Sequence, residues 1–391
     1  HKEVDESLNR DLYEQLIRGI ADGRKKNEAE VRRLLDEGPF LPEQALRHGL
    51  VDDLAYEDQV HDKLIDTRHG RRLEGDDYAR ISPASVGLNK GPRIGVIYAA
   101  GTINSGRSGF DPLNGAIVGS DTLIQHIRQA RRDTSLRAIV LRIDSPGGSA
   151  AASDAIWREL MITRNERADR PLIASMSDLA ASGGYYIAMP AQVIVAQPST
   201  LTGSIGIFGG KLVTGGVYEK LGARIESTSI GRRAEIDSPA RPYTADERQK
   251  VQEQLQAFYD QFVEKVAESR HSEPEKIDAI ARGRVWTGRQ AKQNGLVDQL
   301  GGLERAIAIA KQRAKIPVES EVELVPFPPR KTFYELLSDS LQGASEERTM
   351  GEWMKANLTT AELNALRMIR GPMTMFRRGE PLALMPLTFM R

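Results

Sequence analysis

The chain has 391 residues, of which 40% are apolar and 28% charged, a composition typical of globular proteins that excludes a disordered or fibrous chain. Lys plus Arg balance Asp plus Glu at 54 each, so no whole-chain field attracts nucleic acid, and we expect no nucleic-acid partner. Because there is no cysteine, disulfides, thiolate zinc sites and a cysteine nucleophile are excluded, and we expect neither a metal nor a cofactor.

An internal repeat relates the start of the chain to a segment near residue 290. QALRHGLVDDL (44–54) and QAKQNGLVDQL (290–300) share Gln-Ala, Gly-Leu-Val-Asp and the final Leu at an offset of 246 residues, from Gln44 to Gln290. The same offset places the helical stripe Leu12, Tyr13, Leu16, Ile17 and Ile20 on Phe258, Tyr259, Phe262, Val263 and Val266. A stripe and a motif at one offset indicate duplication. Since a body precedes only the second copy, we expect the chain, which begins at His1, to start inside the first copy.

The body of the second copy, from about Gly91 to Pro242, alternates strand and helix patterns. Strands are predicted at 93–103, 136–143, 172–176 and 192–196, and helices at 122–132, 149–164 and 212–221. Continuous apolar strands that alternate with helices are typical of a mostly parallel sheet covered by helices. Even the longest apolar runs are far shorter than the roughly 20 residues that span a bilayer, so we expect no membrane-spanning segment here.

A long amphipathic helix is predicted after the body. Thr244 and Glu247 form a capping box, and apolar residues then recur every three or four positions as far as Val266. Short helices are expected over 274–316. The chain beyond Val318 has no counterpart in the repeat, and either packs on a neighbour or extends flexibly. The predicted segments are the end of a first repeat (1–65), a linker (66–90), the body (91–243), the helical end of the second repeat (244–317) and a C-terminal extension (318–391).

Two glycine-rich stretches follow predicted strands of the body. DSPGGS (144–149) comes after strand 136–143, and ASGG (181–184) comes after strand 172–176. Backbone N–H groups at a strand-to-helix junction are unpaired, and glycine lets a substrate approach them closely. Side by side, the two stretches are suited to form the paired donors of an oxyanion hole, with Ser182 as nucleophile.

Each stretch alone has a simpler reading. Pro-Gly-Gly is equally compatible with a tight turn, and Ser182 with a helix cap. A rival serine, Ser204 in Thr-Gly-Ser-Ile-Gly, lacks the first glycine of a nucleophile elbow and is better explained as a turn residue.

The general base is harder to assign. None of the six histidines (His1, His48, His61, His69, His126 and His271) falls in the glycine stretches, which argues against a Ser-His-Asp triad. A lysine whose pKa is lowered by burial can do the same work. The lysines of the body are Lys90, Lys211 and Lys220, and Lys211 is the best of these weak candidates.

Four ordered segments resemble signal peptide peptidase A, the protease IV family, in its long tandem-repeat form: RIDSPGGSAAASDAI (142–156), SDLAASGGYYIA (177–188), STLTGSIGIFG (199–209) and VWTGRQAKQNGLVD (285–298). The resemblance covers residues 91–316, with 1–65 matching the end of the first repeat. It implies an α/β fold of the Clp protease/crotonase type, made of repeated β-β-α units. It also implies a serine protease with a Ser-Lys dyad that degrades cleaved signal peptides and other apolar peptides. Ser182 would be the nucleophile, and the N–H groups of Gly147, Gly148 and Gly183 the oxyanion donors.

The lysine of this dyad has no match in the chain. In single-repeat members it lies in the segment that here reads SIGRRAE (229–235), which contains no lysine. Arginine cannot act as the base because it stays protonated. In tandem members the lysine comes from the equivalent position of the first repeat, which would lie upstream of His1. The resemblance therefore implies that this chain carries the nucleophile without its base.

The resemblance further implies attachment to the periplasmic face of the inner membrane, through an anchor absent from this sequence, and assembly as a homotetrameric bowl with enclosed active sites. Two alternatives stay open. A catalytically inactive scaffold of the same fold would explain the missing lysine. A crotonase-type acyl-CoA enzyme would share the fold and the paired backbone donors, but would have no use for the Ser182 hydroxyl.

Overall fold

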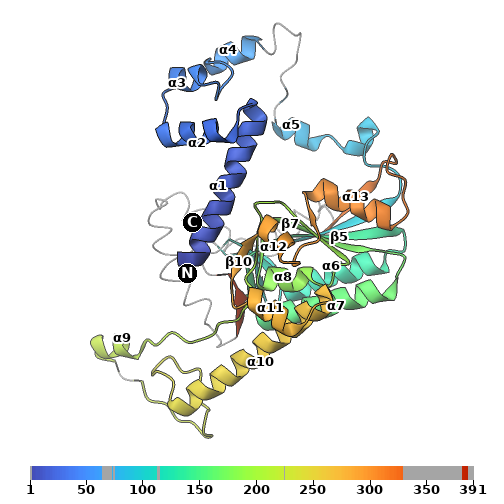
Figure 1. Ribbon diagram of the computed structural model, residues 1–391. Coiled ribbons are helices and arrows are strands. Elements are labelled where there is room, and N and C mark those ends of the chain that lie inside the picture. Colours follow the sequence, from blue (N-terminus) through green and yellow to red (C-terminus); the bar gives the residue numbers. More distant parts are fainter. Residues whose placement is uncertain are drawn as a thin grey trace. The chain divides into compact units, whose positions relative to one another are not determined.

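The computed structural model describes residues 2–63, 73, 75–111, 115–223, 225–328 and 381–385 (Figure 1). The chain divides into two compact units, His1–Lys90 and Gly91–Arg391. His1, His69, part of the predicted linker and most of the predicted C-terminal extension lie outside the described residues.

The first unit is helical. Its described elements are α1 (Lys2–Arg24), α2 (Glu28–Glu37), α3 (Pro42–Arg47), α4 (Glu57–His61), α5 (Gly75–Arg80) and a 3-10 turn (Pro83–Val86). Ile17 and Ala21 of α1 pack against Val31 of α2 in a small buried cluster. Leu16, on the same stripe of α1, is 52% exposed. The first unit thus buries Ile17 of the stripe and leaves Leu16 largely exposed to solvent.

The larger sheet of the second unit carries the core. Within the described residues it has eight strands: β10-β9-β7-β5-β1-β12 in order, with β8 paired to β7 and β11 to β8. Neighbouring strands are parallel, except that β10 runs antiparallel to β9. The strands are β1 (Arg93–Ala100), β5 (Leu136–Ser145), β7 (Leu172–Ala181), β8 (Val193–Ala196), β9 (Leu201–Gly203), β10 (Val285–Thr287), β11 (Gln299–Leu300) and β12 (Glu323–Phe327).

A second, smaller sheet is made of short strands, two of which directly follow β1 and β5 of the larger sheet along the chain. Its order in the described chain is β13-β6-β2-β4-β3, namely Leu382–Leu384, Gly147–Ser149, Thr102–Asn104, Gly115–Gly119 and Gly109–Asp111. The strand predicted over 93–103 is therefore two strands, β1 and β2. They separate at Gly101, where φ is 116° and a Cβ would come within 2.1 Å of the Ala116 carbonyl oxygen. Only glycine allows this bend.

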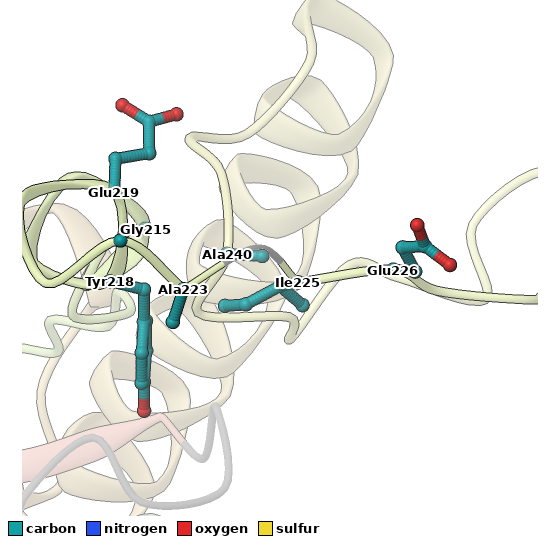
Figure 2. A pocket seen from close by; sticks show the side chains of 8 residues that line it. Gly215, Tyr218, Glu219, Ala223, Ile225, Glu226 and Ala240 are labelled. Atoms are coloured by element: carbon teal, nitrogen blue, oxygen red, sulfur yellow. The ribbon is translucent and has the colours of Figure 1, made fainter.

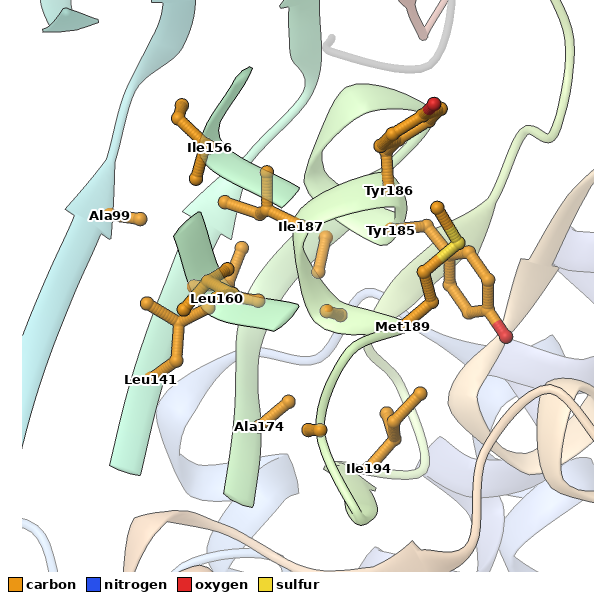
Figure 3. Close-up of a cluster of buried hydrophobic side chains, with 14 of the residues drawn as sticks. Ala99, Leu141, Ile156, Leu160, Ala174, Tyr185, Tyr186, Ile187, Met189 and Ile194 are labelled. Carbon is orange, nitrogen blue, oxygen red and sulfur yellow. The ribbon is translucent and has the colours of Figure 1, made fainter. Parts of the chain in front are cut away.

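Helices cover both faces of the larger sheet. The described helices near the sheet are α6 (Ser120–Arg132), α7 (Ala150–Glu166), α8 (Gly183–Ala188), α10 (Ala245–Arg270), α11 (Pro274–Ile280), α12 (Gly288–Gln293) and α13 (Leu303–Arg313), whereas α9 (Gly215–Lys220) lies away from it (Figure 1). Figure 3 shows one face, where Leu141 and Ala174 of the strands meet Ile156 and Leu160 of α7. On the other face Val140 packs with residues of α13. Among the described helices none combines the length and apolar character that a bilayer crossing requires.

Most predicted elements are confirmed, including the capping box of α10, in which Thr244 Oγ1 accepts from the Glu247 amide (3.2 Å) and Glu247 accepts from the Thr244 amide (2.9 Å). The prediction of helices alone over 274–316 is wrong, because β10 and β11 lie there. These strands of three and two residues are too short to produce a sequence pattern. The extension beyond Val318 also supplies two strands, β12 and β13, that the sequence did not indicate.

Candidate active site

Ser182 lies at a sharp turn between β7 and α8. The strand predicted to end at Met176 continues to Ala181, and α8 begins at Gly183. Ser182 itself has φ 55° and ψ −114°, a conformation that non-glycine residues rarely adopt. Its amide donates to the Gly203 carbonyl (2.8 Å), and its carbonyl accepts from the Tyr186 amide (2.8 Å). Backbone contacts on both sides therefore hold this strained residue in place.

The Ser182 hydroxyl does not cap α8. The residue is 1% exposed, makes no side-chain capping bond, and its Oγ has no hydrogen-bond partner among the described residues. Ser149 provides the contrast, because its side chain accepts from the Ala152 amide at the start of α7. A buried hydroxyl without a partner costs free energy, and such groups call for a functional explanation. Ser182 therefore occupies the N-cap position of α8 without capping the helix through its side chain.

The two glycine stretches meet beside Ser182. A Cβ on Gly147 would come within 2.6 Å of the Gly183 amide nitrogen, and a Cβ on Gly183 would come within 3.1 Å of the Gly147 α-carbon. Gly147 has φ 97° and Gly148 has φ 155°. A side chain on Gly148 would lie 1.9 Å from the Ile103 carbonyl oxygen. Positions 147 and 148 thus admit only glycine, whereas a Cβ on Gly183 would first meet Ser153 Oγ, at 2.6 Å.

The N–H groups of these glycines differ in what they already bind. The Gly147 amide donates to Ser145 Oγ at 3.2 Å. The Gly183 amide is at the first position of α8, where no carbonyl of the same helix can accept from it. Gly148 stands opposite Ala383 in the antiparallel pair β6–β13. The glycine backbones therefore lie next to Ser182, and the Gly183 amide is the one that has no acceptor within its own helix.

Two tyrosines fix the helix that follows Ser182. The Tyr185 hydroxyl donates to the Leu296 carbonyl (2.9 Å), and the Tyr186 hydroxyl bonds to Asp154 of α7 (2.6 Å). Lys265 of α10 donates to the Tyr186 hydroxyl (3.0 Å), also contacts Asp154, and places its ammonium 3.6 Å from the centre of the Trp157 ring. Burial raises the pKa of both tyrosines, which keeps them protonated. No sequence pattern marks Tyr186, Asp154 and Lys265 as a group.

Lys211 is not in contact with the nucleophile. Its Nζ donates to the Ile236 carbonyl (2.8 Å) and lies 4.4 Å from the centre of the Tyr243 ring. Burial lowers the pKa of Lys211, the direction that a base needs, but no hydrogen bond joins it to Ser182. In the segment 229–235, Arg233 forms a two-bond ion pair with Asp246 (2.8 and 2.9 Å). Ser204 follows β9 and has a φ of 49°, and its amide donates to the Arg284 carbonyl (2.8 Å), as expected for a turn residue.

The structure also has a cavity whose lining residues lie between positions 215 and 240, outside both glycine stretches. It measures about 610 Å³ and is shown in Figure 2. No residue of the two glycine stretches lines it, so it is not the site of the serine chemistry. Its lining residues are Gly215, Tyr218, Glu219, Gly222, Ala223, Ile225, Glu226 and Ala240.

A buried serine at a strained strand-to-helix turn, next to paired glycine amides on a mixed α/β scaffold with a parallel sheet, defines the class: serine-type peptidases with a Clp protease-like fold. Comparison with known families narrows the class. Residues 164–317, which include Ser182, match the model of peptidase family S49, and the chain belongs to this family, among the SppA-type proteases.

Individual relatives agree with this assignment. The chain is 36% identical over 366 residues to the chloroplastic serine protease SPPA of Arabidopsis thaliana, an alignment of 89% of this chain and 54% of that protein. It is 38% identical over 321 residues to protease 4 of Salmonella typhi, covering 81% of this chain and 50% of the relative. It is 33% identical over 369 residues to protease 4 of Haemophilus influenzae, covering 90% of this chain and 58% of the relative. The chain thus spans about half the length of these relatives.

Proposed function

We propose that this chain is the nucleophile-bearing part of a serine endopeptidase with a Ser-Lys dyad. The observation that carries the proposal is the Ser182 turn, in which a strained serine with a buried, unpartnered hydroxyl adjoins the Gly147–Gly183 contact. Strain of this kind persists where the surrounding structure enforces it, and it is common at reactive residues.

In the proposed reaction Ser182 is the nucleophile, a lysine transfers the protons and the glycine amides bind the oxyanion. A neutral lysine takes the proton of the Ser182 hydroxyl as Oγ attacks the carbonyl carbon of the peptide bond. The negative oxygen of the tetrahedral intermediate accepts hydrogen bonds from the Gly183 amide and from the Gly147 or Gly148 amide. The lysine then protonates the leaving amine, and water releases the acyl group from Ser182 by the reverse sequence of proton transfers.

We infer that the lysine comes from a first repeat upstream of His1. Ser182 Oγ has no hydrogen-bond partner among the described residues, and 229–235 contains no lysine. The repeat supports a preceding body independently. Phe262 of α10 is fully buried against Tyr186, with ring centres 4.7 Å apart, whereas its counterpart Leu16 of α1 is 52% exposed. An apolar face buried in one copy and open in the other is what a missing body would leave.

The substrates, location and assembly belong to the same proposal. Cleaved signal peptides and other apolar peptides are the proposed substrates, and Ala180, Ala181 and Ile187, close to Ser182 in the sequence, are apolar and fully buried. We propose a location at the periplasmic face of the inner membrane. We further propose that it assembles as a homotetramer whose enclosed active sites exclude folded proteins.

The experiment compares this chain with a form that contains a complete upstream repeat. Hydrolysis of an apolar signal-like peptide is followed by chromatography, with Ser182→Ala as the inactive reference. Activity that requires both the upstream repeat and Ser182 supports the split dyad. Full activity of the chain alone would place the base within these residues, and Lys211→Ala would then be the next variant.

A second candidate is an inactive scaffold with the same fold, favoured by the absence of any side chain bonded to Ser182 Oγ in the described chain. A completed protein that remains inert towards peptides, while still binding them, would support it.

A further inference from the structure

A short segment near the C-terminus lies in the candidate active site. Residues 382–384 form β13, which pairs antiparallel with β6, so that Leu382 faces Ser149, Ala383 faces Gly148 and Leu384 faces Gly147 (Figure 1, red). The glycines predicted to bind the oxyanion are thus the residues against which this strand is laid. β13 is remote in sequence from every other strand of its sheet.

Backbone hydrogen bonds hold the segment on both edges. On one side the Ala150 amide donates to the Pro381 carbonyl (3.1 Å), and the Met385 amide donates to the Pro146 carbonyl (2.8 Å). On the other side Leu382 and Phe208 exchange two bonds, of 2.8 and 3.1 Å. Main-chain pairing of this kind accepts any extended peptide, because it uses no side chain.

One carbonyl of the segment lies at the point where the glycine stretches meet. A Cβ built on Gly147 would come within 2.0 Å of the Ala383 carbonyl oxygen, and one built on Gly183 would come within 3.0 Å of the same atom. In an antiparallel pair of strands, every second pair of opposed residues exchanges backbone hydrogen bonds. Ala383 and Gly148 are therefore the hydrogen-bonded pair that lies between the Ala150–Pro381 and Met385–Pro146 bonds. An acyl carbonyl of a substrate would need the same surroundings beside Ser182.

The side chains of the segment are enclosed as those of a bound peptide would be. Leu382 is 6% exposed, Leu384 is 5% exposed, and Ala383 and Met385 are fully buried. The central position is the smallest residue of the segment, Ala383, which lies opposite Gly148.

We propose that residues 381–385 are an internal pseudosubstrate: the segment occupies the peptide-binding cleft as an added strand and competes with peptide substrates. This inference rests on the proposed function and adds to it a means of control. It also indicates the form of the substrate, an extended peptide with a small residue opposite Gly148 and apolar residues on each side.

The test is a binding measurement in the Ser182→Ala background, where no cleavage can occur. A fluorescent peptide with the sequence GEPLALMPLT (379–388) is titrated into the full chain and into a chain that ends at Arg378, and anisotropy is recorded. We expect the shortened chain to bind the peptide at least tenfold more tightly. A peptide with Glu in place of the alanine should bind neither chain.

A point variant covers the case in which the shortened chain does not fold. Ala383→Glu in the full chain should expel the segment and open the cleft to the labelled peptide, whereas Ala84→Glu, at an exposed alanine, should not. Equal binding by full and shortened chains, or no binding to a folded shortened chain or a folded Ala383→Glu variant, would overturn the proposal. Because the readout is binding, an inactive enzyme that still binds the peptide contradicts only the proposed peptidase activity.

Discussion

Gly147 and Gly183 are so close that a Cβ on Gly147 would come within 2.6 Å of the Gly183 amide nitrogen. The contact joins residues 36 positions apart in the sequence and brings the two glycine stretches together beside Ser182. Because backbone atoms of both residues are involved, neither can move away as a flexible side chain would. The geometry of the site depends on these two positions being glycine.

Gly147→Ala should therefore abolish peptide hydrolysis by the complete protein, with a loss of at least about a hundredfold in kcat, as for other oxyanion donors that are removed or displaced. The control is Gly106→Ala. Gly106 has a similar φ of 91° but open space around a Cβ, so it should lose only about 1 kcal/mol of stability and keep its activity. Equal activities of the two variants would contradict the assigned role of Gly147.

The tyrosine that anchors α8 gives a second prediction. Tyr186→Phe removes the hydroxyl that bonds Asp154 and Lys265 and should lower the free energy of unfolding by about 1–2 kcal/mol. Urea denaturation followed by circular dichroism measures the change. Tyr56→Phe, at a residue that is 79% exposed, should leave the unfolding midpoint unchanged, and an equal loss in both variants would count against the anchoring role.

The N-terminus of α10 should make stability depend on acid pH. Hydrogen bonds from Arg241 and the Thr244 amide lower the pKa of Glu247 from 4.5 to about 2. A depressed carboxyl pKa stabilises the fold above the unfolded value and loses this contribution as pH falls from 4.5 towards 2. Glu247→Gln should thus melt below the wild type at pH 7, with a difference that shrinks as pH falls through this window. Glu264→Gln, at an exposed position of the same helix, should show no such trend.

The repeat predicts unequal effects at matched positions. Phe262→Ala should destabilise the second unit by about 3–5 kcal/mol, since the side chain is fully buried. Leu16→Ala, at the equivalent position of the first unit and 52% exposed, should cost less than about 1 kcal/mol in this chain. In a protein with the upstream repeat the cost at Leu16 should rise to about 2–5 kcal/mol, as for a core leucine. An unchanged cost there would argue against a body covering this face.

Local patterns were sufficient to predict much of the site. Ser182, Gly147 and Gly183 stood out because small residues follow apolar strands, and the structure brings all three together. The sequence predicts the end of β7 five residues too early, at Met176, because Ser177 and Asp178 are polar residues typical of a loop. In the fold, Arg142 of β5 donates to Ser177 Oγ (2.8 Å) and ties these polar positions into the sheet.

The C-terminal strand could not be predicted in the same way. PLALM has no β-branched residue and no alternation of apolar and polar side chains, so nothing local marks it as a strand. Its pairing with β6 arises from contacts between residues more than 200 positions apart. The role of Gly203 could not be predicted either. Its carbonyl accepts a hydrogen bond from the Ser182 amide, but nothing in the sequence around it indicates this contact.

The central claim, that Ser182 is the nucleophile, is tested most directly by covalent labelling. The form that contains the upstream repeat is treated with a fluorophosphonate, digested, and mapped by mass spectrometry. The account predicts one modified serine, Ser182, with labelling lost in Ser182→Ala and retained in Ser204→Ala. Labelling of Ser204 in place of Ser182, or labelling that persists in Ser182→Ala, would contradict it.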